Sequence, residues 1–499
     1  MESGTHAAAI TALTCTPIVI IYLTARRNPF VSLLALLYFV FVQVGLFMFF
    51  IGPEFVQARF GAFRLLENVD QSDILETSLI VTVGLVIIAA CSMLPLPGEP
   101  AGPKPAKIGI KPDYLSVTVL ILGAVLGVAF IATVLIPAVG IAEETGSIPD
   151  FLTLRRSAGQ DYLLILAVFN LLPMCALYLL LAAESNRRLR WLFWSAYLLT
   201  TVALFFTFQK RSLIVHLALM AVFMVTLHVY RVGARNILSV KHVARISAIL
   251  TVPVIALGGL YFIEQNYGRG VRISDAPIEQ PAPPPGKSAP PATTTPGEKP
   301  AQAKPEKLPK VVLPSPLSKS MSIGRRIFIA GRSVVSRTLG RMALSSVMLV
   351  AFVPEHQPHY GLSNVGLLAN VQGRDLYNPG GDVFEHFKRR QTAAMGNIST
   401  PALIDLYGQF GWAGVVVGSV LIGIGLAVLS WLLRLVRYDR ASYLFLLAAG
   451  GLAVFYLSQA NIFRAALGYG GAIFLLCWAI FFRRSILHAW RLFRREQSG

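Results

Sequence analysis

The sequence predicts an all-α protein that crosses a membrane about eleven times, and composition and the spacing of its apolar residues both support this. Of the 499 residues, 55% are hydrophobic and only 14% are charged, whereas a soluble domain carries roughly 25% charged residues. The mean hydropathy is +0.62. Runs of about 20 apolar residues, the length that crosses ~30 Å of hydrocarbon, recur along the chain. A composition of this kind requires lipid as its solvent.

The predicted spans fall into two transmembrane regions. Residues 1–263 hold helices 1 to 8, and residues 401–499 hold helices 9 to 11 followed by a cytoplasmic tail. The last span is the shortest. The apolar runs that define the spans are 6–24, 30–52, 74–95, 114–138, 162–183, 191–208, 212–229, 246–263, 411–433, 441–459 and 470–482.

The basic loops predict the orientation of these spans. Short loops rich in Lys and Arg stay in the cytoplasm, and here they alternate with less basic loops, which places the N-terminus outside and the C-terminus inside. The first apolar run is followed, not preceded, by basic residues, so we expect a retained span rather than a signal peptide. The loops predicted to be cytoplasmic hold Arg26 and Arg27; Lys104, Lys107 and Lys111; Arg187, Arg188 and Arg190; Arg231, Arg235, Lys241 and Arg245; Arg434, Arg437 and Arg440; and the tail 483–495.

A long external loop separates the two transmembrane regions at residues 264–400. Within it, residues 276–310 consist mainly of Pro, Ala, Thr and Lys, and such a stretch buries too little apolar surface to offset the entropy of ordering. We expect this segment to be a disordered tether. Residues 311–400 have a mixed composition with aromatic residues and turn signals, so we expect a structured, partly helical segment.

Charge and cysteine usage exclude several classes of function. The net charge is +19, but the basic residues are spread over many short loops, so we expect no nucleic-acid partner. The four cysteines, Cys15, Cys91, Cys175 and Cys477, all lie inside apolar runs, where a thiol behaves as a small apolar group. The sequence contains no HExxH, CxxC or paired-Asp pattern, so we expect neither a metal site nor a cofactor.

Four local patterns add a resemblance to a known family. They are a basic turn that opens a span (FQKRSLI, 208–214), an Arg-rich helical pattern (GRRIFIAGRSVVSRTLGR, 324–341), the segment HYGLS (359–363) and the segment PALIDLYGQFGWAGVVVG (401–418). With the multi-span layout, they resemble the bacterial oligosaccharide repeat-unit polymerases, the O-antigen polymerase (Wzy-type) family. Family sequences usually have Glu where Asp405 stands, and the proline-rich tether looks like an insertion.

The resemblance implies a GT-C-like helical body in the bacterial inner membrane. It also implies that the chain polymerises undecaprenyl-pyrophosphate-linked oligosaccharide repeat units on the periplasmic face. A hydroxyl of one lipid-linked unit would attack the reducing-end carbon of a growing glycan, and lipid pyrophosphate would leave. The implied partners are this lipid-linked oligosaccharide, membrane lipids, a chain-length regulator and a flippase.

A leaving pyrophosphate needs cations at the membrane surface, and Arg supplies a permanent charge with a planar fork of donors. Each external Arg or Lys also has a structural alternative, because such side chains commonly extend to lipid headgroups without binding a substrate. Residues 324–341 fit a helix that lies on the membrane surface equally well. The residues that we expect to bind pyrophosphate are Lys210, Arg211, Arg325, Arg332, Arg155, Arg389 and Arg464.

The attacking hydroxyl needs a proton acceptor, and the candidates are His359, Asp375 and Asp405. His359 ranks first and Asp375 second. His359 lies in a tight-turn context between Pro358 and Gly361. The alternative for Asp405 is structural, because it follows Pro401 in the first turn of a predicted helix, where an acid offsets the helix dipole.

Three other functions stay open at this stage. A glycan ligase would use the same donor and the same kind of external Arg-rich loop. A transporter would favour internal repeats and charged or broken helices near the membrane centre, but no repeat is evident, and the midspan positions are nearly free of ionisable side chains apart from His216 and His228. A structural scaffold of the cell envelope would use the external Arg residues for lipid contact alone.

Overall fold

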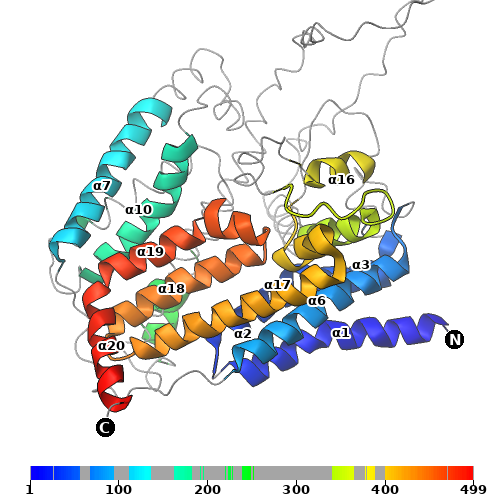
Figure 1. Cartoon of the computed structure of the whole chain (residues 1–499), viewed down its shortest axis with the longest axis horizontal. Coiled ribbons are helices and arrows are strands. Elements are labelled where there is room, and N and C mark those ends of the chain that lie inside the picture. The colour runs from blue at the N-terminus through cyan, green and yellow to red at the C-terminus, as the bar shows by residue number, and fades with distance from the viewer. Residues whose placement is uncertain are drawn as a thin grey trace, which may run out of the picture.

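The computed structural model describes residues 2–25, 27–54, 56, 68–94, 112–135, 162–182, 340–364, 377, 379–387, 399–468 and 470–497, with short stretches between 191 and 251. Throughout these ranges the regular elements are helices (Figure 1). The predicted all-α class is therefore confirmed for the described part of the chain.

The helices of the N-terminal region match the first five predicted spans. Six described helices have the length and apolar composition to cross a membrane, and four of them belong to this region. The bounds are α1 Glu2–Thr24, α2 Pro29–Tyr38, the π-helical turn η1 Phe39–Gln43, α3 Val44–Ile51, α6 Gln71–Ser92, α7 Tyr114–Phe130, the π-helical turn η2 Ile131–Leu135 and α10 Tyr162–Ala182. The segment Pro29–Ile51 counts as one span.

The C-terminal region supplies the other two spans of membrane length, Ala402–Leu435 and Arg440–Leu457. Its elements are α16 Pro379–Phe387, α17 Ala402–Leu435, α18 Arg440–Leu457, the π-helical turn η4 Arg464–Gly468, α19 Gly471–Phe481 and α20 Arg483–Gln497. A further apolar helix covers Gly340–Phe352. The predicted spans 191–208, 212–229 and 246–263 lie largely outside the described residues, so the total of eleven stays a prediction.

Successive helices run in opposite directions through one bundle (Figure 1). Helices α1, α6, α10, α17 and α19 point one way, and α2, α7 and α18 point the other way. The start of α1 and the end of α20 lie at opposite ends of the bundle (Figure 1). This alternation is the one that the predicted topology requires of the described spans.

The sequence explains where these helices begin. Asn28 caps α2, because its side chain accepts a hydrogen bond from the Val31 N–H at 3.2 Å and Pro29 follows at the first helical position. Asp113 caps α7 through the Ser116 N–H at 2.9 Å. Asp439 caps α18 through the Ala441 N–H at 3.2 Å. Each cap satisfies a backbone donor that the first helical turn leaves open.

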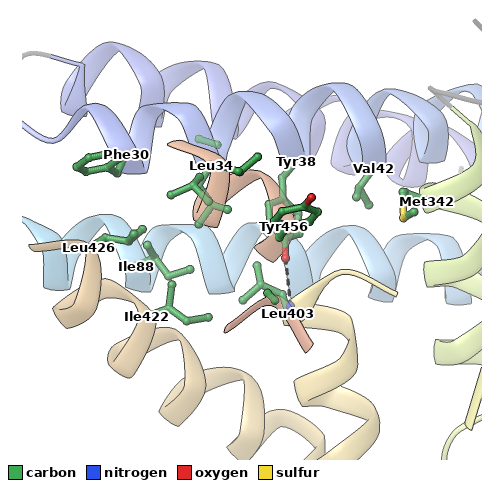
Figure 2. Packing of buried hydrophobic residues seen from close by; sticks show 14 of the residues in the cluster. Phe30, Leu34, Tyr38, Val42, Ile88, Met342, Leu403, Ile422, Leu426 and Tyr456 are labelled. Carbon is green, nitrogen blue, oxygen red and sulfur yellow. Dashed lines mark hydrogen bonds between the residues drawn. The ribbon is translucent and has the colours of Figure 1, made fainter. Parts of the chain in front are cut away.

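Helix α17 packs closely against α6 and α2, and this contact forms the centre of the bundle. Figure 2 shows Leu34 and Tyr38 of α2 beside Ile88 of α6 and Leu403 of α17. The backbones approach because glycine lies at the contact: a Cβ on Gly423 would come within 2.9 Å of the Ile88 carbonyl oxygen. Small residues allow this close packing inside a membrane, where dispersion contacts hold helices together.

Buried polar groups join the same helices. The Asn28 side chain donates to the Leu426 carbonyl at 3.2 Å and accepts from the Ser430 hydroxyl at 2.6 Å. Gln43 donates to the Ser78 carbonyl at 3.1 Å, and the Ser78 hydroxyl donates back to Gln43 at 2.7 Å. Paired side chains of this kind stabilise helix contacts where water is scarce.

Helix α17 begins nine residues earlier than the predicted span 411–433, and a break at Gly411 explains the difference. Gly411 has φ 62° and ψ −150°, a conformation open mainly to glycine. A Cβ on Gly414 would fall 2.3 Å from the Leu406 carbonyl oxygen, so residues 402–410 bend back tightly on the helix that follows. A straight 34-residue helix would extend about 51 Å, far beyond ~30 Å of hydrocarbon, whereas the part after the break has the length of one crossing.

The bundle has two chemically different ends. At one end, which we call the basic end, an Arg434 guanidinium N–H donates to the Arg27 carbonyl, and Arg483 pairs with Asp113 at 3.0 Å. These residues belong to separate segments that the sequence predicts on one side of the membrane. At the other end, which we call the site end, lie the starts of α6 and α17. Which membrane face each end occupies stays a prediction.

Candidate functional site

The candidate site is built around Asp405, in the first turn of α17 at the site end. Its backbone N–H donates to the Pro401 carbonyl at 3.0 Å, so the sequence reading of a first-turn acid is correct. The side chain, however, is only 3% exposed. A carboxylate can offset a helix dipole while it is exposed to solvent. The burial of Asp405 therefore calls for another explanation, which its side-chain hydrogen bonds provide.

Three side chains donate hydrogen bonds to Asp405. The Tyr360 hydroxyl reaches Oδ1 at 2.9 Å, the Asn364 amide reaches Oδ1 at 3.2 Å, and the Gln409 amide reaches Oδ2 at 2.9 Å. The same Gln409 amide donates to Asn364 Oδ1 at 3.0 Å. We call these four residues the carboxylate network. A buried carboxylate needs such donors, because each missing donor leaves part of the free-energy cost of removing the group from water uncompensated.

The network attaches the segment 357–364 to the start of α17. The Tyr360 N–H donates to the Gly408 carbonyl at 3.2 Å, and the Gly361 N–H donates to the Gln409 carbonyl at 2.9 Å. A Cβ on Gly408 would lie 2.5 Å from the Tyr360 hydroxyl oxygen, so glycine is required for this approach. The main-chain and side-chain bonds together fix the segment on the helix.

Burial and the Asp405 charge keep the Tyr360 hydroxyl protonated. Desolvation raises the pKa of Tyr360 well above its ordinary value of 10.0, and the neighbouring carboxylate raises it further. Tyr360 is therefore a hydrogen-bond donor throughout the physiological pH range. Its function in the site is to orient groups rather than to exchange protons.

His359 is the exposed member of the site. Its ring meets the Tyr407 ring edge to face, with centroids 5.7 Å apart and an interplanar angle of 89°. The break at Gly411 makes room for it, because a Cβ there would lie 3.0 Å from His359 Nε2. His359 thus lies beside the bend of α17 with its ring accessible, as a general base requires.

Tyr407 connects this histidine to helix α6. Its hydroxyl donates to Glu76 Oε1 at 3.0 Å, and its ring also meets Trp412 across the break at a centroid distance of 6.2 Å. Glu76 is partly exposed. Glu76, Tyr407 and His359 therefore form a line from α6 to the exposed edge of the site.

Arg464 adds a positive charge near the same carboxylate. It is exposed at the beginning of η4, its N–H is held by the Asn461 side chain at 2.7 Å, and its charge acts on Asp405. Arg464 is the one sequence-predicted anion ligand within the described residues. The Ser399 hydroxyl donates to the Gln459 carbonyl at 2.7 Å, which holds the segment that leads to Arg464 beside the start of α17.

Two histidines, His356 and His386, form a pair of neighbouring rings. The rings of His356 and His386 are 4.3 Å apart, and the Phe352 ring meets His386 at 5.3 Å. Burial lowers the pKa of His386 below its usual 6.5, and His356 lowers it further. The pair fixes α16 against the end of the helix Gly340–Phe352.

Several predicted site residues lie outside the described residues. They are Asp375, Lys210, Arg211, Arg325, Arg332, Arg155 and Arg389. Their proposed roles stay predictions. Across the part of the chain that the structure describes, no cluster of three or more His, Cys, Asp or Glu side chains could hold a metal ion.

Sequence reasoning missed five residues of the site: Glu76, Tyr360, Asn364, Tyr407 and Gln409. One signal was available, because Asp405 and Gln409 are four residues apart and therefore share a helix face. The partners on other segments carried no such signal, since Glu76 is separated from Tyr407 by 331 positions.

Comparisons with known proteins return no relatives for this chain. Neither a protein-family model nor a curated protein nor a solved structure matches it.

Proposed function

We propose that this chain is a membrane glycosyltransferase that polymerises undecaprenyl-pyrophosphate-linked oligosaccharide repeat units. The observation that supports it best is the convergence of three sequence-predicted residues. His359 directly precedes Tyr360, which donates to Asp405, and the charge of Arg464 acts on Asp405. The three residues come from separate segments of the chain, and all lie at the site end of the bundle.

The proposed chemistry assigns each group one task. His359 accepts the proton of the attacking sugar hydroxyl as the new C–O bond forms at the reducing-end carbon. The bond from that carbon to the pyrophosphate oxygen breaks, and its electron pair leaves with the lipid pyrophosphate. Arg464 stabilises the charge that develops on this leaving group, together with the predicted ligands Lys210, Arg211, Arg325 and Arg332.

In this proposal the buried residues act through His359. The carboxylate network holds the segment 357–364 on α17, and the Tyr407 ring fixes the face that His359 presents. Asp405 and Tyr407 are therefore positioning residues. A base held in place in advance lowers the entropy cost of reaching the reactive geometry.

The test supplies purified protein in liposomes with a lipid-linked repeat unit and measures polymer on a gel. We expect His359→Gln to lower the rate about 100-fold or more and Arg464→Ala to lower it by a similar factor. Arg464→Lys should recover part of the loss, because the charge stays while the planar fork is lost. His488→Gln, at the basic end, is the matched control and should retain the wild-type rate.

A deletion experiment separates polymerase from ligase. Cells that lack a polymerase should carry single repeat units on the surface, whereas cells that lack a ligase should accumulate lipid-linked polymer. Full activity of both His359→Gln and Arg464→Ala in folded protein would contradict the proposed site.

A further inference from the structure

Helix α20 turns sharply away from the bundle axis. It starts at Arg483, directly after α19 ends at Phe481, and the two helices meet at 75°. Its 15 residues include five arginines and one glutamate, so it does not fit the hydrocarbon core. A helix at this angle to a membrane-spanning neighbour lies close to the plane of the membrane surface.

One face of α20 is fixed to the bundle. Phe493 and Ala489 are buried with Leu435 of α17, and the Trp431 ring meets the Phe493 ring at 6.2 Å. At the start of the helix, Asp113 pairs with Arg483 at 3.0 Å and with Arg484 at 3.7 Å. These contacts fix the rotation of α20 about its own axis, and so determine which of its side chains point away from the bundle.

The flank next to this buried face is apolar and exposed. Leu487 is 54% exposed and Trp490 is 38% exposed, and three residues apart on a helix they are neighbours. Arg494 lies over the Trp490 ring, 5.5 Å from its centroid. A Trp ring beside an arginine is the composition found at the headgroup level of a bilayer.

The face opposite the buried one is basic. At about 100° per residue, Arg491 and Arg495 fall on the side that faces away from Phe493, and both are exposed. A buried stripe, an apolar flank and a basic outer face together match an interfacial helix. The same end of the bundle also carries Arg434 and Arg437.

We infer that α20 is a binding surface for anionic lipid headgroups at the basic end. Charge complementarity identifies the occupant: the outer face carries arginine without a matching set of acids on the helix, and each basic residue near an anionic surface contributes about as much as a weak ion pair. Leu487 and Trp490 enter the acyl boundary, and the arginines contact phosphate. This inference is independent of the reaction proposed for the site end.

The experiment measures the melting temperature of the full-length protein in neutral detergent with added lipid. We expect phosphatidylglycerol to raise it by about 3 °C or more over the same amount of phosphatidylcholine. The triple variant Arg491→Gln, Arg494→Gln, Arg495→Gln should lose most of this difference. The corresponding Arg→Lys triple should keep it, because the charge is retained.

A second triple variant serves as the control. Lys287→Gln, Lys299→Gln and Lys304→Gln remove the same amount of charge from the proline-rich segment, and the lipid response should persist. Equal loss in both Gln triples would show a general charge effect and overturn the inference. A response to phosphatidylglycerol no larger than that to phosphatidylcholine would overturn it as well, and would point to an acidic protein partner instead.

Discussion

The Tyr360 hydroxyl donates a hydrogen bond of 2.9 Å to Asp405 Oδ1, although 45 positions separate the two residues. Both side chains are buried, and two backbone hydrogen bonds run beside this contact. The segment that carries His359 is therefore held to α17 by a buried side-chain hydrogen bond and two main-chain hydrogen bonds. The position of His359 depends on these contacts, because it is the residue directly before Tyr360.

The first prediction concerns this bond. Asp405→Asn should lower the free energy of unfolding by about 1–3 kcal/mol, because an amide nitrogen in the place of Oδ2 would face the Gln409 donor, while the one remaining oxygen accepts from Tyr360. Tyr360→Phe should cost about 1–2 kcal/mol. The double variant should show a coupling of about 0.5–3 kcal/mol in a denaturation cycle. Tyr114→Phe, at a 93% exposed tyrosine, should change little, and additive losses at 360 and 405 would disprove the coupling.

The second prediction tests the break in α17. Gly411→Ala forces a side chain into a positive-φ position and brings a Cβ to 3.0 Å from His359 Nε2. We expect a loss of about 1–3 kcal/mol in stability and a larger loss in polymer formation. Gly425→Ala is the control, because nothing lies within 4 Å of its added Cβ, and it should be neutral or slightly stabilising. Similar behaviour of the two variants would mean that the break is not required.

The third prediction isolates the hydrogen bond between Tyr407 and Glu76. Tyr407→Phe keeps the ring against His359 but removes the 3.0 Å bond. Under the proposed reaction we expect kcat to fall about tenfold, on the scale of one hydrogen bond, with little change in KM. Glu76→Gln retains an acceptor oxygen and should lose less. Steady-state kinetics with lipid-linked repeat unit provide the measurement, and a change in KM alone would assign Tyr407 to substrate binding.

The fourth prediction concerns pH and His386. Its pKa is lowered by burial and by His356, so the unfolded chain binds the proton more readily than the folded chain. Stability is therefore complete above the unfolded pKa of about 6.5 and declines as the pH falls toward the folded value. His386→Gln should reduce the loss of melting temperature between pH 7.5 and pH 5.5, whereas His488→Gln should leave it in place. An unchanged slope in His386→Gln would assign the acid sensitivity to other groups.

The sequence predicted the helices well because their signal is local. The apolar runs at 30–52 and 74–95 coincide with Pro29–Ile51 and Gln71–Ser92, since any segment of that length and composition must satisfy its backbone within itself in lipid. The predicted span 411–433 begins nine residues after the start of α17, although a helix start after Pro401 was predicted correctly. Residues 402–410 are less apolar than a span, but they are helical because tertiary contacts with Tyr38 and Tyr360 hold them.

The site was predicted only in part because most of its contacts are not local. His359, Asp405 and Arg464 were chosen for their chemistry and for the side of the membrane on which they were expected. Their arrangement depends on Tyr360 and Glu76, which belong to other segments, and no periodic pattern links these to Asp405. Asn364 and Gln409 were missed because an amide carries no charge, although a buried carboxylate requires donors of this kind.

The contact between Asn28 and Ser430 has a consequence for how the protein is made. The two residues are 402 positions apart, and at ~5–20 residues per second a ribosome needs about 20–80 seconds to cover that distance. During this time the Asn28 amide lacks its Leu426 acceptor and the Ser430 donor. The contact between the first and the second transmembrane region can therefore form only after α17 has been made, so the order of synthesis separates the folding of α2 from its final packing.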